Sequence, residues 1–491
     1  MFIFVITIFG AILRSSNISF HRLYPDYYQN LIVAHNISEF HSVIGYLGKE
    51  GMLYPDFFMW TRPIYPLIIN FFNFFISNID KAAFMTSFTL GIVSIPLVYF
   101  FLKKLFNNIG IAFSGALLIA ISFSHVVWGG FMLTETTGVF FSLLLFISVL
   151  KGLENKPLLA NSNDLITGLL LALAVFTRYE YITFIVPMIY LYLTKNEKLY
   201  VRVINIAVSF LFVAALIIYE LFPLKWITKI FLSQTDTFAK IDIFSKPLNF
   251  QGVWTFFRLD FFLGIAFVFG IIYLFRVRVY RKYLFFALLG IFSLLPFYYR
   301  INPMMYRYET HLLPFILIPS SVGLYQLLKV REKLGLFIKM ILFLLFIFQC
   351  FITWNGMKSW NQGEWMRSGY DESAARIVSS KIDQSKDLLL VSFPEPYYFY
   401  SRASVYSVID KPPFIYIQKE LEDRRIVIVV DMGMHDLFPR FTAQVRSRLK
   451  KYKKTEFKID KTYHFGDYSI KEKYPVEMYI LTVGQLKSSL K

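Results

Sequence analysis

Apolar runs separated by short charged clusters dominate the chain up to Trp354. An apolar segment at 1–13 is followed by a mixed stretch at 14–83, after which such runs recur. A membrane-spanning helix needs about 20 predominantly apolar residues. By that criterion the pattern predicts about eleven transmembrane helices. They are the first segment and runs near 84–102, 110–128, 131–150, 164–177, 179–194, 203–220, 259–275, 283–299, 311–328 and 335–353.

The pattern changes after about Trp360, where short apolar runs are bounded by charged and turn residues. DLLLVSF and RRIVIVVD have the length and β-branched content of buried strands, with helical patterns between them. We therefore predict a transmembrane domain at 1–354, with its first extracytoplasmic loop at 14–83, and a soluble α/β domain at 355–491. The basic run RSRLKKYKK, at Arg446–Lys454, is predicted as a solvated helix face, with membrane headgroup contact as the alternative.

Composition supports a membrane protein. Of the 491 residues, 56% are hydrophobic and 17% are charged, whereas a soluble domain has roughly 45–50% apolar and about 25% charged residues. The net charge of +18 comes from short basic clusters between the apolar runs, which is typical of topology signals and argues against nucleic-acid binding. Cys350 is the one cysteine, so no intrachain disulfide can form. The first segment lacks a basic start and an A-x-A site, so we interpret it as a retained helix.

The basic clusters also predict the orientation. With a cytoplasmic N-terminus, the short loops near 103–104, 151–156, 195–202, 276–282 and 329–333 face inward and satisfy the positive-inside rule. The loops that contain Asp26, Glu135, Arg178 with Glu180, and positions 298–311 then face the opposite side, as does the C-terminal domain. We predict a multi-pass protein of the cell membrane whose unusual polar residues collect on its extracytoplasmic face.

Each of these polar residues also has a structural interpretation. Asp26 follows Pro25, and apolar residues recur after it at helical spacing, so it is predicted in the first turn of a helix. Glu135 suits a helix start in the same way. Arg178 and Glu180 can form an ion pair in a turn between two helices, and Arg307 can extend toward lipid headgroups. The histidines at 21, 35, 41 and 125 do not show zinc spacing.

Taken together, five segments resemble the polytopic type C glycosyltransferases, which include protein mannosyltransferases, aminoarabinose transferases and oligosaccharyltransferase catalytic subunits. The segments are PDYYQNLIVAHNI after the first helix, TRPIYP, the Thr134–Glu135 pair, FTRYEYITFIVP and MMYRYETHLLPFILIP. They cover the chain from Met1 to about Trp354 in the order and topology of that superfamily. One departure is that a single acid stands at Asp26, where many relatives have two adjacent acids.

The resemblance implies transfer of a sugar from a polyprenyl-phosphate carrier to an acceptor hydroxyl on the extracytoplasmic face, with inversion. An acceptor hydroxyl needs a base, and a phosphate leaving group needs positive charge. The predicted partners are the lipid-linked sugar, a glycan, lipid or protein acceptor, and membrane lipids. No cofactor is certain; a divalent metal held by the residues at 26 and 135 stays open. The expected site residues are Asp26 as general base, Arg178, Arg307 and Arg62 for the donor phosphate, and Glu135, Glu180 and Tyr308 in support.

Two alternatives stay open at this point. An oligosaccharyl- or glycan-ligase-type transferase that uses a diphosphate carrier is the nearest. A lipid or solute transporter is an alternative from another class, and it predicts internal repeats and broken helices at the bilayer midplane. Neither feature is clear in the sequence, and the charged residues collect at one predicted surface. A scaffold without activity does not need such a set of carboxylates and arginines.

Overall fold

The computed structural model divides into two compact units. One comprises residues 1–20 and 62–358, and the other comprises residues 21–61 and 359–491. The structure describes residues 1–15, 25–41, 62–154, 158, 160–194, 199–221, 257–301, 306–330, 332–391, 394–401, 403–407, 424–431, 439–465, 468–482 and 485. The segment at 21–61, predicted as part of the first extracytoplasmic loop, groups with the C-terminal residues.

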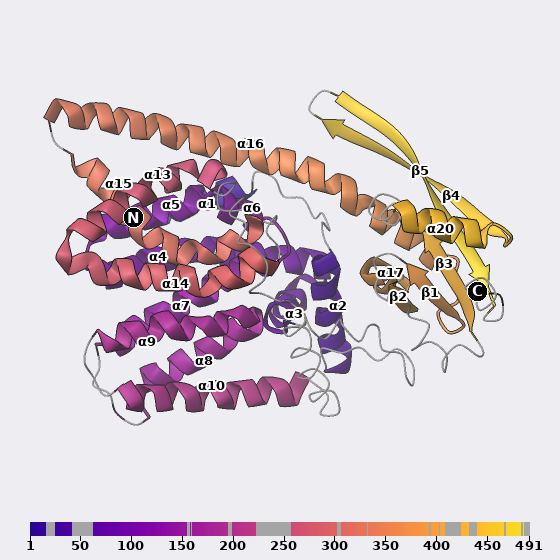
Figure 1. The fold of residues 1–491 in the computed structure, drawn as a ribbon, viewed down its shortest axis with the longest axis horizontal. Helices are drawn as coiled ribbons and strands as arrows, with labels where there is room; N and C mark the ends of the chain where they lie inside the picture. Colours follow the sequence, from indigo (N-terminus) through magenta and orange to yellow (C-terminus); the bar gives the residue numbers. More distant parts are fainter. Residues whose placement is uncertain are drawn as a thin grey trace. The chain divides into compact units, whose positions relative to one another are not determined.

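The first unit is a bundle of helices (Figure 1). Its described elements are α1 (Phe2–Ser15), α3 (Ile64–Ile76), α4 (Ile79–Phe106), α5 (Ile109–Ile121), α6 (Phe123–Gly129), α7 (Glu135–Gly152), α8 (Ser162–Thr177), η2 (Tyr179–Phe184), α9 (Ile185–Leu193), α10 (Leu199–Leu221), α13 (Phe261–Arg276), η3 (Arg278–Tyr280), α14 (Arg281–Ile301), η4 (Tyr306–Leu312), α15 (Leu313–Lys329) and the first part of α16 (Glu332–Ser379).

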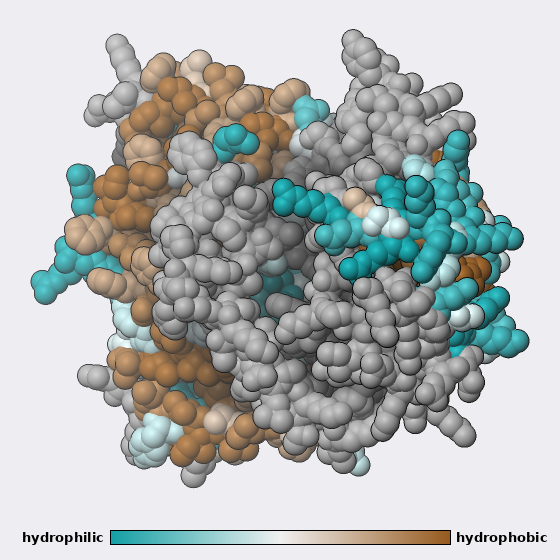
Figure 2. All heavy atoms as spheres, turned by 45° about the vertical axis from the view of Figure 1, so that its right-hand side comes forward, coloured by the Kyte–Doolittle hydropathy of each residue, from teal (hydrophilic) through white to brown (hydrophobic). Residues whose placement is uncertain are grey.

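Several of these helices suit a bilayer. Among the described residues, five are long and apolar enough to cross a membrane, or up to seven if each of two bent helix pairs is one span. Four shorter apolar helices, of 10–17 residues, accompany them. Large apolar side chains such as Phe74, Phe212 and Leu344 are exposed, and Figure 2 shows that the visible face of the helical unit is mainly hydrophobic. The polytopic helical fold is confirmed, whereas the count of eleven spans stays a prediction.

Asparagine residues fix the turn between α4 and α5. Asn107 ends α4 in the left-handed region, with φ of 50°, and its N–H donates to Lys103. Asn108 then accepts from the N–H of Ile111 at 3.1 Å and so caps α5. Asparagine is favoured at both positions, because it tolerates positive φ and its side chain replaces a missing helical partner.

A buried carboxylate supports a break inside one predicted span. The run near 110–128 forms α5 and α6, which are bent by 56° at Ser122. Asp260, which is fully buried, accepts from the N–H of Phe123 at 2.6 Å, the N–H of Ser124 at 3.0 Å and the Ser122 hydroxyl at 3.2 Å. It therefore satisfies backbone donors that the first turn of α6 leaves without helical partners.

The second unit contains a five-stranded sheet. Its elements are α2 (Pro25–Phe40), the later part of α16, β1 (Asp387–Val391), α17 (Pro394–Ser401), β2 (Ser404–Ser407), β3 (Arg425–Val430), α20 (Pro439–Leu449), β4 (Lys454–Phe465) and β5 (Tyr468–Leu481). The strand order is β2-β1-β3-β5-β4. β1 pairs in parallel with β2 and β3, and β5 pairs antiparallel with β3 and β4.

The two predicted strands are β1 and β3, which lie side by side at the centre of this sheet. Their side chains form a buried cluster with Leu449 of α20 and Tyr479 and Leu481 of β5. Arg425 donates to both carboxylate oxygens of Asp387, at 2.7 and 2.8 Å, and so ties the first residues of the two strands together. The predicted C-terminal α/β domain is confirmed as a small sheet with helices.

The basic run at 446–454 was predicted as a solvated helix face, and this prediction is wrong. α20 ends at Leu449, which is 2% exposed and belongs to the buried cluster. The chain then turns, and β4 begins at Lys454. Burial of Leu449 against the sheet fixes the end of the helix, so the basic residues that follow it are carried by a turn and a strand.

Candidate active site

A buried ionic cluster lies where α7, α8 and η2 meet in the helical unit. Glu135 is the first residue of α7 and is 1% exposed. Arg178 links the end of α8 to η2 in an extended conformation, with φ of −153° and ψ of 115°, and is 2% exposed. The sequence predicted both a helix start at Glu135 and a turn at Arg178. The turn is in the protein interior rather than at an exposed surface.

Arg178 is held by partners from three elements. Its Nε donates to Glu180 Oε1 at 2.7 Å. Its Nη1 donates to the Thr134 hydroxyl at 3.2 Å and lies 3.6 Å from Glu135 Oε1. The Tyr308 ring lies against the guanidinium, 5.4 Å from Cζ to the ring centroid. A buried arginine held this way has one fixed orientation, because each contact uses a different part of its planar group.

Arg62 adds a second positive charge to this group. It precedes α3, is partly exposed, and interacts electrostatically with Glu180 and with Tyr179. Two arginines and two glutamates therefore form one cluster, whose formal charges cancel when all four groups are ionised. Charges taken out of water require such compensation. Of the predicted site residues, the structure brings together Arg62, Glu135, Arg178, Glu180 and Tyr308.

The remaining predicted site residues are placed only by their backbone. Asp26 is the second residue of α2, as predicted from Pro25, and Tyr27, Leu31, Ala34 and Ile37 after it are buried. α2 belongs to the unit at 21–61 and 359–491, where Tyr28 packs against two rings of α17. Arg307 is the second residue of η4. The side chains of Asp26 and Arg307 lie outside the described residues.

A tyrosine–histidine pair lies in the same unit, and the sequence analysis missed it. The hydroxyl of Tyr181, in η2, makes a short hydrogen bond with Nδ1 of His311, in η4, and both residues are fully buried. A Cβ added at Gly138 of α7 would lie 2.3 Å from the Tyr181 hydroxyl and 3.1 Å from His311 Nδ1. The glycine is therefore needed for this close approach. His311 in the segment YETHLL carries no spacing signal that would have selected it.

A second hydrogen-bonded group links α3, α4 and α7. The Tyr65 hydroxyl lies 2.8 Å from that of Ser87 and donates to the carbonyl of Ala83 at 3.2 Å. The carbonyl of Ser87 accepts from the Thr136 hydroxyl at 3.3 Å. Tyr65 also interacts electrostatically with Glu135. These bonds fix the first turn of α7, which carries Glu135, relative to the segment that follows Arg62.

The described residues hold few candidate metal ligands in one place. Among the residues with described positions, no three His, Cys, Asp or Glu side chains lie close enough together to hold a metal ion. The predicted pairing of Glu135 with Asp26 involves a side chain outside that part of the chain. Glu135 itself offers a buried carboxylate whose Oε1 faces Arg178.

Comparisons with known proteins agree with this fold. Residues 61–224, which include Arg62, Glu135, Arg178 and Glu180, match the family model described as dolichyl-phosphate-mannose-protein mannosyltransferase. No curated protein matches the sequence.

Among solved structures, the chain is similar to ArnT from Cupriavidus metallidurans. With ArnT bound to undecaprenyl phosphate the TM-score is 0.64 at 10% identity, covering 99% of this chain and 98% of that one. The apo state gives 0.61 at the same identity and coverage. The archaeal oligosaccharyltransferase AglB from Archaeoglobus fulgidus, in complex with an inhibitory peptide and a dolichol-phosphate, gives 0.56 at 11% identity, covering 96% of this chain and 74% of that one.

ArnT and AglB are both type C glycosyltransferases. The fold match runs over nearly the whole chain, and the family match falls on the segment that carries most of the buried ionic cluster. The resemblance predicted from the sequence is confirmed, and the protein has the fold of the polytopic type C glycosyltransferases.

Proposed function

We propose that this protein transfers a sugar from a polyprenyl-phosphate carrier to an acceptor hydroxyl on the extracytoplasmic face of the cell membrane, with inversion at the anomeric carbon. The observation that carries the proposal is the buried cluster of Arg62, Glu135, Arg178 and Glu180 within the family-matched segment. The acceptor is a glycan, a lipid or a protein. In this orientation the N-terminus is cytoplasmic and the C-terminal unit is extracytoplasmic.

The carrier class follows from chemistry and from the relatives. The description of the matched family names a dolichyl-phosphate sugar, and the two similar proteins were solved with undecaprenyl phosphate and with a dolichol-phosphate. Each of these carriers has a long apolar chain and an anionic head. A protein with apolar helices exposed on its surface and arginines inside the bundle offers both kinds of environment.

Asp26 is the proposed general base. The acceptor hydroxyl oxygen forms a bond to the anomeric carbon while the bond from that carbon to the phosphate oxygen breaks, and the hydroxyl proton passes to the carboxylate. A positioned base typically contributes about 10²–10⁴-fold to the rate. Asp26 lies in the first turn of α2, where the positive end of the helix dipole favours the ionised carboxylate, which is the form that can accept a proton.

The arginines stabilise the leaving phosphate in this proposal. The lipid phosphate leaves as a stable anion, so it needs positive charge more than a proton donor. Arg62 and Arg307 contact the phosphate. Arg178, whose Nε and Nη1 face Glu180 and Glu135, contributes its charge and keeps the cluster in place. Tyr308 supports Arg178 through the ring contact. No step of this scheme passes through a metal ion.

The test uses the purified full-length protein with a panel of labelled polyprenyl-phosphate sugars, scoring release of the lipid phosphate. Asp26→Asn keeps the size and the hydrogen-bonding capacity of the side chain but cannot accept the proton. Glu39→Gln is the matched control, because Glu39 lies on the same helix and its side chain is 53% exposed, against His35. We expect turnover to fall by about 10²-fold or more in Asp26→Asn and to be unchanged in Glu39→Gln.

Unchanged turnover in Asp26→Asn would remove Asp26 as the base and direct the search to Glu135 and Glu180. Turnover only with polyprenyl-diphosphate donors would favour the oligosaccharyl- or ligase-type alternative. If no donor of either class reacts in the presence of a range of acceptors, while the protein moves a labelled lipid across a vesicle membrane, the transporter alternative replaces the transferase.

A further inference from the structure

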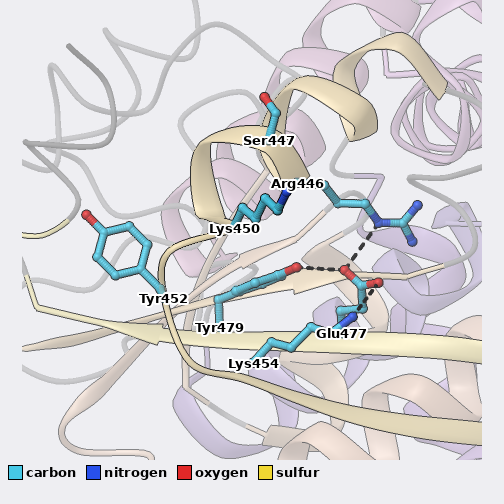
Figure 3. Close-up of a pocket in the computed structure, with 7 residues that line it drawn as sticks. All are labelled: Arg446, Ser447, Lys450, Tyr452, Lys454, Glu477 and Tyr479. Carbon is cyan, nitrogen blue, oxygen red and sulfur yellow. Dashed lines mark hydrogen bonds and ion pairs between the residues drawn. The ribbon is translucent and has the colours of Figure 1, made fainter.

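A basic pocket lies in the second unit. It is formed by the end of α20, the turn that follows it, and the strands β4 and β5 (Figure 3). Its volume is about 390 Å³, within the range of roughly 300–1,000 Å³ that is usual for small-molecule sites. The lining residues are Arg446, Ser447, Lys450, Tyr452, Lys454, Glu477 and Tyr479.

Glu477 organises one side of this pocket. Its side chain is 8% exposed and accepts from Arg446 Nε at 3.2 Å, Lys454 Nζ at 3.4 Å and the Tyr479 hydroxyl at 2.8 Å. Figure 3 shows these side chains converging on the carboxylate. A buried acid with three donors holds its partners in fixed positions, so Arg446 and Lys454 are ordered before any ligand arrives.

The pocket keeps an excess of positive charge. Three cations, Arg446, Lys450 and Lys454, line the pocket with one acid, Glu477. Lys454 also pairs with Glu456 at 2.9 Å, so the group as a whole has a formal charge of +1. Lys450 is exposed and makes no ion pair with the described residues. A phosphate monoester carries about −1.5 to −2 at pH 7 and three strong acceptor oxygens. The charge of the pocket is therefore complementary to such a group, and a carboxylate would satisfy part of it.

Two tyrosines and a serine complete the lining. Tyr452 donates through its hydroxyl to the carbonyl of Gln485 at 2.9 Å, which fixes its ring at one side of the pocket. Tyr479 is 4% exposed and its hydroxyl faces Glu477. Both tyrosine hydroxyls donate within the protein, so the Tyr452 ring offers an apolar face and Ser447 offers a hydroxyl. Such a lining suits a ligand with apolar faces and polar edges, as a sugar ring has.

We infer that this pocket binds an anionic saccharide, a sugar that carries a phosphate or carboxylate group. Lys450 and Arg446 pair with the anionic group, Lys454 contributes charge from β4, and the sugar ring packs against Tyr452. The site is formed by residues of the second unit, and the proposed transfer chemistry uses none of them. In this proposal, three basic residues of the run at 446–454 bind a ligand rather than only face solvent.

The test measures binding by calorimetry with the full-length protein in a neutral detergent. The probes are glucose 6-phosphate, glucuronate, glucose, inorganic phosphate and glycerol phosphate. We expect glucose 6-phosphate to bind roughly 2- to 10-fold more tightly than inorganic phosphate or glycerol phosphate, because only the former packs a ring against tyrosine. Glucose should bind weakest of all, because it lacks the charge.

Variants locate the site. Lys450→Glu should weaken glucose 6-phosphate binding by on the order of tenfold, because it removes one charged hydrogen bond and adds repulsion. Lys453→Glu makes the same change of charge at an exposed residue of the same turn that does not line the pocket, and it should bind like wild type. Both positions are exposed, so both variants should fold.

Three results would overturn the inference. One is wild-type binding in Lys450→Glu, and another is equal weakening in both variants, which would mean a non-specific charge effect. The third is equal affinity for glucose 6-phosphate, inorganic phosphate and glycerol phosphate, which would identify a plain anion or lipid-headgroup site. Because binding is read without turnover, failure here leaves the transferase proposal untouched. Loss of turnover in Asp26→Asn likewise leaves the binding result untouched.

Discussion

Removal of the positive charge at Arg178 should destabilise the helical unit and lower turnover. The two effects can be measured separately. Arg178→Gln keeps a donor but leaves Glu135 and Glu180, whose side chains are 2% and 12% exposed, without this cation. It also loses the contact of the guanidinium with the Tyr308 ring. Breaking a buried ion pair by removing one partner costs about 3–5 kcal/mol. The midpoint of thermal unfolding should fall by on the order of 5 °C.

A second arginine offers a matched control. Arg202 of α10 is fully buried, donates to Asp164 Oδ1 at 3.1 Å and lies 5.4 Å from the Tyr192 ring centroid. It therefore has a buried acid and an aromatic ring as partners, as Arg178 does, but it has no part in the candidate site. Arg202→Gln should lower the unfolding midpoint by a similar amount.

The assay compares both variants at a temperature at which each is folded. Unfolding is followed by tryptophan fluorescence in detergent, and turnover by release of the lipid phosphate. We expect turnover to fall by 10²-fold or more for Arg178→Gln and by less than about threefold for Arg202→Gln. Equal turnover in the two folded variants would refute the functional role of Arg178 and leave it a structural ion pair. An unchanged unfolding midpoint in Arg178→Gln would refute the electrostatic reasoning itself.

Two other predictions concern packing and pH. Gly138→Ala should lower the free energy of unfolding by about 1–3 kcal/mol, because the added Cβ would clash with the Tyr181 hydroxyl. Gly91→Ala is the control, since its Cβ would meet its nearest atom at an ordinary 3.4 Å and the change should be neutral. Thermal unfolding compares the two variants. In the sheet, burial opposes ionisation of Glu477, but donors and cations outweigh it and lower its pKa from 4.5. Its stabilising contribution is therefore complete above pH 4.5 and lost as the pH falls through the lowered pKa. The protection of β5 amides against hydrogen exchange, taken relative to intrinsic exchange at the same pH, should fall on acidification in wild type more than in Glu477→Gln.

The parts of the fold that were predictable have strong local signals. Apolar runs of spanning length predicted the helical unit, and the β-branched runs at β1 and β3 predicted the sheet. The hairpin of β4 and β5 escaped prediction because its strands are rich in lysine and glutamate, as KTEFKIDK shows. Their pairing is fixed by backbone hydrogen bonds and by a few apolar residues such as Val476, which is 1% exposed.

The sequence predicted which residues belong to the candidate site, but it did not predict which of them contact one another. Arg178 and Glu180 are two residues apart, so their pairing follows from the turn. The contact of Arg178 with Thr134 spans 44 positions, and the pairing of Tyr181 with His311 spans 130. Such contacts depend on how helices pack, which hydropathy does not specify. The position of Asp260 under α6 is a third example, because nothing in its local sequence distinguishes it from a surface aspartate.

Four polar residues of the helical unit, three of them charged, share one feature. Glu135 begins α7, Arg178 follows α8, Asp260 precedes α13 and Tyr308 lies in η4, so each stands at a break in a helix. Backbone groups at such breaks lack helical partners, and within a bilayer they must be satisfied by the protein. A polar residue there is therefore required whether or not chemistry takes place. The comparison of Arg178→Gln with Arg202→Gln separates the two roles, because Arg202 is a buried, ion-paired arginine that lies inside α10.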